Sequence, residues 1–202
     1  MLVPHLKSGG TGIWVDTALS AMMTHNDRAS TSACLAFVGM LWELLDMTAA
    51  PDRAWWVERY VELSSDLEGD TVYSPRGGLF SDYRGSLWRF VREKLSWADS
   101  AGLTGIDACN ACYSGAFLLE TVPSVLLILM RYADDAEQAI VRAVNDTKDN
   151  DTVAAIVGAA VGALHGKRSI PDRWITNLSG RTTDRDDGRI FELIARARGR
   201  FW

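Results

Sequence analysis

The 202-residue chain is 48% hydrophobic and 23% charged, a balance typical of globular proteins that excludes a disordered or fibrous chain. Its 21 Lys and Arg and 26 Asp and Glu leave a net charge of −5 and form no dense basic stretch. This charge disfavours nucleic-acid and membrane-surface partners, and it fits a small substrate in a local pocket better. The N-terminus lacks the apolar core and cleavage site of a signal peptide, so we expect a cytoplasmic protein.

The cysteine content is low: Cys34, Cys109 and Cys112 are an odd number and too few for a disulfide framework. The spacing of Cys109 and Cys112 is also found in zinc and redox sites. However, the three histidines are scattered singly, and no strand is predicted before the pair. We therefore expect two buried, reduced, metal-free thiols, with a functional pair as the alternative.

Apolar residues recur at helical spacing along almost the whole chain. The segment 33–45 is apolar nearly all round, which is typical of a helix in the middle of a bundle. Pro51 is expected in the first turn of the next helix. The apolar segment 116–130, interrupted by Glu120 and Pro123, is too short to span a bilayer and predicts buried core. The other helical stripes, in chain order, are Trp56, Val57, Tyr60 and Val61; Leu87, Trp88, Val91 and Leu95; Ala136, Ala139, Ile140, Ala143 and Val144; Val153, Ile156, Val157, Ala160, Val161 and Leu164; and Ile190, Leu193, Ile194 and Ala197.

No segment shows the sustained alternation of a strand, so the sequence predicts an all-α helical bundle. Two segments, 64–85 and 166–187, are rich in glycine, proline and polar residues and are predicted to be long loops. Loops of this length inside a compact domain are often functional, and a solvated connection is the alternative.

The stretch from Asn145 to Thr152 concentrates side chains that bind metal ions. Asp149 and Asp151 are separated by one residue, so a turn can direct both carboxylates to one side, and Thr152 adds a hydroxyl. Carboxylate and hydroxyl oxygens are hard ligands that suit Mg²⁺ or Mn²⁺. The alternative is that Asp149 or Asp151 only caps the helix that follows.

The helix predicted after this turn carries Gly158, Gly162 and Gly166, each four residues from the next. An interior glycine costs a helix about 1 kcal/mol relative to alanine, so two of them usually have a packing reason. We expect another backbone to approach this face. The helix would then be packed on both sides and support the acidic turn rigidly.

Four segments of the chain occur in an order typical of one known family. The acidic turn and glycine spacing of Asp149-Asn-Asp-Thr-Val-Ala-Ala-Ile-Val-Gly-Ala-Ala-Val-Gly-Ala-Leu-His-Gly166 are followed by Ile170-Pro-Asp-Arg-Trp174. Together they resemble the C-terminal signature of the ADP-ribosylglycohydrolases. Ala21-Met-Met-Thr-His-Asn-Asp27 resembles the Thr-His segment of that family, and Ser114-Gly-Ala-Phe-Leu-Leu-Glu-Thr121 resembles its Gly-Tyr-Val-Val-Asp-Ser segment. The resemblance covers nearly the whole chain.

The resemblance implies an all-α fold around a pair of divalent ions, Mg²⁺ or Mn²⁺. At these ions ADP-ribose is cleaved from an ADP-ribosylated protein or small molecule. By position, Asp149, Asp151 and Thr152 match the C-terminal metal ligands of the family, and His25 matches a histidine that lines its substrate cleft. The alternative for His25 is a capping or core-satisfying histidine.

Two departures from the family pattern bear on activity. Phe117 stands where many members have a tyrosine, and the sequence contains no Ser/Thr-Asp-Asp metal motif. The resemblance therefore implies that residues 1–202 are the C-terminal portion of a single, N-terminally truncated domain holding half of the binuclear site. The catalytic residues are then expected in the missing N-terminal part, or in a separate segment, without which the chain is inactive. The alternative is a non-catalytic binding or structural relative, like the lens crystallins that resemble this family.

Overall fold

The computed structural model describes residues 3–6, 10–178 and 189–201, and every regular element in these ranges is helical. The elements in chain order are η1 (Val3–His5), α1 (Gly12–Met22), α2 (Arg28–Leu44), α3 (Arg53–Glu68), α4 (Leu87–Phe90), the π-helical η2 (Val91–Leu95), α5 (Ser96–Ser100), α6 (Gly105–Ala111), α7 (Leu118–Tyr132), α8 (Ala136–Asp146), α9 (Asn150–His165), η3 (Lys167–Ser169), α10 (Asp172–Leu178) and α11 (Arg189–Phe201). Tyr73 and Gly85 form an isolated antiparallel β-bridge. The predicted all-α fold is confirmed for the described residues.

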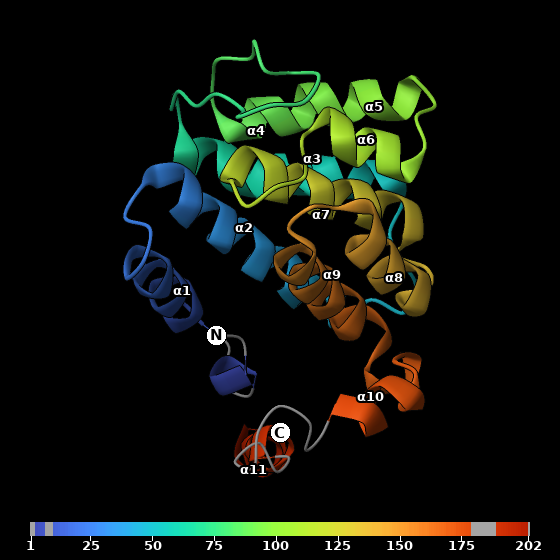
Figure 1. The fold of residues 1–202 in the computed structure, drawn as a ribbon. Coiled ribbons are helices and arrows are strands. Elements are labelled where there is room, and N and C mark those ends of the chain that lie inside the picture. The colour runs from blue at the N-terminus through green and yellow to red at the C-terminus, as the bar shows by residue number, and fades with distance from the viewer. Residues whose placement is uncertain (1–2, 7–9, 179–188, 202) are drawn as a thin grey trace.

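Helix α7 forms the centre of the bundle, where it contacts α3, α6, α8 and α9 (Figure 1). Eleven of its 15 residues are buried, so the prediction of buried core for the segment 116–130 is confirmed. Within the described ranges, none of the helices has both the length and the apolar character needed to cross a membrane.

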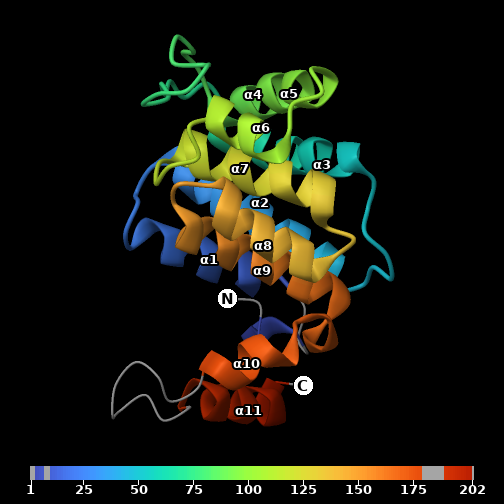
Figure 2. The same cartoon turned by 45° about the vertical axis from the view of Figure 1, so that its right-hand side comes forward.

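The long helices α2, α3, α8 and α9 pack around α7. Helix α2 packs between α1 and α3 and also touches α9, which agrees with its prediction as an interior helix. Arg59 on α3 donates from Nε to both carboxylate oxygens of Glu43 on α2, at 2.9 and 3.0 Å. Helices α4 to α6 lie at one end of the bundle, and α10 and α11 lie at the other (Figure 2).

Helix α3 is longer than the sequence suggested, because the predicted loop from Ser64 begins only after Glu68. Ser64 and Glu68 are fully buried, and the Glu68 carboxylate accepts hydrogen bonds from the amides of Leu87 and Trp88 at 2.6 and 3.0 Å. This contact with the first turn of α4 stabilises the last turn of α3, a long-range effect that local composition does not reveal. The second predicted loop, 166–187, also contains η3 and α10, and its residues 179–187 lie outside the described ranges.

The expected close packing against the glycines of α9 is wrong for the described part of the chain. A Cβ atom added at Gly158 would meet only Ile140, at 4.0 Å, and one added at Gly162 would meet no described atom within 4 Å. The opposite face is buried as predicted, through Val153, Val157 and others. Helix α9 therefore packs on α2, α7 and α8, without the close backbone approach that its glycines suggested among the described residues.

The cysteines are free thiols of unequal exposure. Cys109 and Cys112 are buried at the end of α6, whereas Cys34 is exposed. Burial raises the pKa of Cys109 to about 12 and also raises the pKa of Cys112. The pKa of Cys34 is raised too, by partial burial and by the nearby Asp27.

Since the thiolate is the nucleophile, we expect a maleimide at neutral pH to label Cys34 in the folded protein, more slowly than a free thiol. Cys109 and Cys112 should be labelled only after unfolding in urea. Mass spectrometry of timed samples measures this order. Labelling of all three thiols at similar rates in the folded protein would contradict the burial of the α6 pair.

Candidate functional site

The acidic turn joins α8 to α9. Helix α8 ends at Asp146, and Asp149 occupies the N-cap position of α9. The Asp149 side chain makes no capping hydrogen bond, so the capping alternative for it is not supported. Asp151 lies in the first turn, where its Oδ1 accepts from the Thr152 amide at 2.9 Å. The side chains of Asp151 and Thr152 are exposed, and Asp149 is half-buried.

A second loop, between α6 and α7, is bonded directly to this turn. The carbonyl oxygen of Ser114 accepts from the amides of Lys148 and Asp149, at 3.1 Å each. Tyr113 and Ser114 have positive φ values of 71° and 44°, which non-glycine residues rarely adopt. Such strain persists only where the surroundings fix it, and it clusters at functional sites. The conformation of the Ser114 loop is therefore tied to that of the acidic turn.

The glycines of the loop 69–86 make room for this strained segment. A Cβ at Gly78, whose φ is +80°, would lie 2.4 Å from the carbonyl oxygen of Ala111. A Cβ at Gly77 would lie 2.8 Å from the ring of Tyr113. The amide of Leu79 donates to the same Ala111 oxygen at 2.8 Å. The loop 69–86, the segment between α6 and α7, and the acidic turn are distant in sequence and thus meet at one place.

An ion pair fixes the wall between these segments. Arg76 donates from Nε and Nη2 to the two carboxylate oxygens of Glu120, at 2.9 and 2.6 Å. The Glu120 side chain is fully buried, and Arg76 is about half exposed, at 53%. The hydrogen bonds to Glu120 raise the pKa of Arg76. Gly115 sits against this pair, because a Cβ there would lie 2.6 Å from Glu120 Oε2.

Beside these groups lies a largely open cavity of about 360 Å³, lined by Arg76, Tyr113, Gly115, Ala116, Lys148 and Asp149. Of the metal ligands and the cleft histidine expected from the sequence, Asp149 lines the cavity. Asp151 and Thr152 follow in the first turn of α9 and are not among the lining residues. A cavity of this size is in the range of small-molecule sites.

The donor chemistry of the turn is compatible with a hard divalent cation. The side chains of Asp149 and Thr152 form no hydrogen bond with any described residue, so their oxygens are not engaged elsewhere. Nowhere in the described ranges do three or more His, Cys, Asp or Glu side chains gather in a group that could hold a metal ion. The turn thus offers two carboxylates and a hydroxyl, fewer ligands than such an ion takes.

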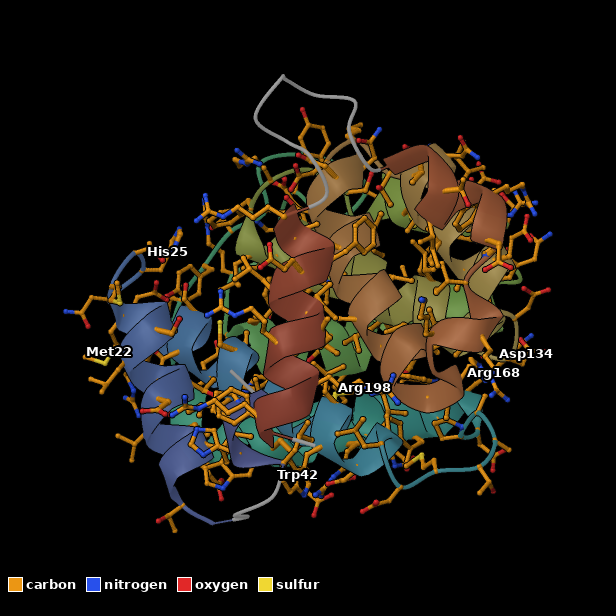
Figure 3. The ribbon with its side chains drawn as sticks, turned by 90° about the horizontal axis from the view of Figure 1, so that it is seen from below. Met22, His25, Trp42, Asp134, Arg168 and Arg198 are labelled. Atoms are coloured by element: carbon orange, nitrogen blue, oxygen red, sulfur yellow. The ribbon has the colours of Figure 1, made fainter. Side chains whose placement is uncertain are left out.

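His25 lies on the connection between α1 and α2 and is not among the residues that line the cavity. Its ring is exposed and its Nδ1 lies 3.0 Å from Thr24 Oγ1. Figure 3 shows it at the outer edge of the molecule near Met22. It is neither a cap nor a core residue, since Asp27 caps α2 through the amide of Ser30.

A chain of contacts nevertheless runs from this connection to the cavity wall. The Tyr73 hydroxyl donates to Asp27 at 2.9 Å, and the rings of Tyr73 and Phe117 lie 6.4 Å apart. Phe117 in turn lies under the guanidinium of Arg76, 5.4 Å away. Burial alone would raise the pKa of Asp27, but hydrogen bonds from Ser30 and Tyr73 outweigh it and lower that pKa. Burial and the bond to Asp27 raise the pKa of Tyr73 to about 12.

Four residues of this site were missed by sequence reasoning: Arg76, Tyr113, Glu120 and Lys148. Glu120 carried a usable signal, because a charge inside an apolar helix must find a partner when it is buried. The sequence indicates the glycine-rich loop that supplies Arg76, but it does not indicate that Arg76 pairs with Glu120. Nothing local in the sequence indicated that Tyr113 and Lys148 would meet.

Comparison with known protein families identifies the family of this chain. The sequence profile of the family described as ADP-ribosylglycohydrolase matches residues 13–200. The chain therefore belongs to the ADP-ribosylglycohydrolase family, which makes it a hydrolase-like protein. No curated protein and no solved structure matches it.

Proposed function

We propose that this protein hydrolyses the glycosidic bond between ADP-ribose and an acceptor, with Mg²⁺ or Mn²⁺ bound at the acidic turn. The observation that carries the proposal is the carboxylate of Asp149. It lines the cavity at the start of a firmly seated helix and has no hydrogen-bond partner among the described residues. An unpartnered carboxylate next to another carboxylate and a hydroxyl suits a cation better than it suits a purely structural turn.

Asp149, Asp151 and Thr152 would hold the ion, which when bound polarises oxygen atoms and lowers the pKa of water. The remaining residues shape the cavity. The Arg76–Glu120 pair packs against Gly115 in the cavity wall. The amides of Lys148 and Asp149, which donate to the carbonyl oxygen of Ser114, fix this wall relative to the acidic turn. Such fixed positioning is one way in which a binding site favours reaction.

The test is an assay of ADP-ribose release from ADP-ribosylated peptides and small molecules by the full chain, with Mn²⁺, Mg²⁺ or EDTA. The proposal includes a second ligand set of the Ser/Thr-Asp-Asp type on a separate segment, so the assay is run with and without a family N-terminal segment. We expect metal-dependent release that this segment increases and EDTA abolishes. Metal binding without release in any combination would instead support the non-catalytic alternative.

A further inference from the structure

Helix α11 has an apolar side that the rest of the described chain leaves uncovered. Ile190, Leu193 and Ile194 share one face at positions i, i+3 and i+4, and they are 61%, 52% and 55% exposed. The helix packs against η1, and none of its own residues is buried. Figures 1 and 2 both place it at the end of the molecule opposite α4 and α5. A surface helix normally turns such a stripe toward the core, so this face is available to a partner.

Arginines border this apolar stripe on both sides. Arg189, Arg196 and Arg200 recur at i, i+7 and i+11, so they share one edge of the helix. Arg198 falls on the other edge, and Figure 3 shows it to one side of α11. These four arginines form no ion pair with a described carboxylate. With Glu192 as its one acidic residue, α11 is a basic segment in a chain whose net charge is −5.

We propose that α11 docks on a lipid surface that contains anionic headgroups, with the stripe of Ile190, Leu193 and Ile194 at the edge of the acyl region. A basic amphipathic helix with this distribution of charge lies in the plane of such an interface. Its aliphatic side chains enter the apolar layer, while the long arginine side chains on both edges extend to headgroup phosphates. The inference goes beyond the proposed function, because it concerns where the protein acts and not which bond it cleaves.

The charge of the whole chain restricts the contact to this end of the molecule. An anionic surface repels an acidic protein in general, whereas each arginine close to the headgroups is attracted to it. The contact is therefore expected through α11 and not through the bundle.

Two other kinds of partner fit this face less well. Dominant contacts in protein interfaces are usually tryptophan, tyrosine or arginine in a packed pocket, and the exposed stripe of α11 consists of aliphatic side chains. A second copy of this chain, pairing stripe to stripe about a two-fold axis, would bring arginine edges together, and like charges oppose this. A lipid surface satisfies both the stripe and its basic edges.

Co-sedimentation of the full chain with vesicles tests the proposal. We expect binding to vesicles of phosphatidylcholine and phosphatidylserine in equal parts, and much weaker binding to phosphatidylcholine alone. Binding to the mixed vesicles should fall at high salt, which screens the attraction. Arg196→Gln combined with Arg200→Gln should weaken it about thirtyfold, roughly fivefold for each arginine near an anionic surface. Leu193→Gln combined with Ile194→Gln should weaken it at least about tenfold, because the apolar stripe is lost.

A charge-matched control keeps the result interpretable. Arg53→Gln combined with Arg92→Gln removes two exposed arginines of α3 and η2, and it should bind the mixed vesicles as the natural chain does. Circular dichroism melting checks that each variant is folded. Equal binding to the two kinds of vesicle, or equal losses in the two arginine pairs, would overturn the inference. Binding to soluble polyglutamate that is as strong as vesicle binding and survives Leu193→Gln would also overturn it, in favour of an acidic protein partner.

Discussion

Binding of Mn²⁺ is expected to weaken by at least tenfold when Asp151 is replaced by alanine. Asp151 supplies one of the two carboxylates in the turn. Its side chain is exposed, and one of its carboxylate oxygens accepts a hydrogen bond from the amide of Thr152. Loss of even an outer-shell partner commonly costs about 10–100-fold in metal affinity, so loss of a direct ligand should cost at least as much. Titration calorimetry with Mn²⁺ on the full chain measures the effect.

A matched pair of variants separates a ligand from a helix cap. Asp151→Asn keeps an oxygen for the Thr152 amide but removes the charge, so it should preserve the helix start and still weaken Mn²⁺ binding. Asp134→Ala removes an exposed carboxylate before the start of α8, at the opposite end of this helix from the acidic turn, and should leave binding unchanged. If Asp151→Asn binds Mn²⁺ as tightly as the natural chain does, the turn is not a metal site.

The helices could be predicted because their signals are local. The stripe from Val153 to Leu164 repeats at helical spacing, and the observed α9 contains all of it. The same holds for α8, whose predicted first residues follow the cap formed by Asp135. Periodicity reports which face of a helix meets the core. It does not report what meets the other face, and this is why the packing expected around Gly158 and Gly162 was wrong.

The acidic turn could be found from the sequence, but the cavity beside it could not. Asp149 and Asp151 are neighbours in the chain, so their pattern is visible without a fold. Lys148 meets Tyr113 across 35 positions, and Arg76 meets Glu120 across 44. Such contacts depend on how α6, α7 and the loop 69–86 are placed, and no local propensity encodes them.

The end of α3 shows the same limitation in the fold itself. Composition predicted a loop from Ser64 because polar and small residues begin there. The helix instead continues to Glu68, whose carboxylate accepts a hydrogen bond from the first amide of α4. The N-cap residue of α4, Ser86, makes no side-chain capping bond, so Glu68 takes over this role. The residues next to Glu68 in the sequence do not indicate that its carboxylate caps a distant helix.

Glu68→Ala is expected to destabilise the protein by about 3–5 kcal/mol. It would remove a fully buried acceptor from the amides of Leu87 and Trp88 and from the hydroxyl of Thr71. A hydrogen bond to a charged group contributes about 1.5–3 kcal/mol, and each buried donor left without a partner costs about 1–3 kcal/mol. Glu68→Gln keeps acceptor oxygen and should lose roughly half as much. Urea unfolding followed by tryptophan fluorescence measures these differences.

The effect of Glu68→Ala should also reach the candidate site, because Glu68 ties together the two ends of the loop that carries Arg76. Hydrogen exchange should accelerate first at Leu87 and Trp88 and then along the loop 69–86, before global unfolding. Glu62→Ala is the matched control on the same helix. Its side chain is exposed and, among the described residues, pairs with Arg59 at i,i−3, so the substitution should cost about 0.5 kcal/mol or less. Similar losses in the two variants would show that the buried carboxylate does not hold α3, α4 and the Arg76 loop together.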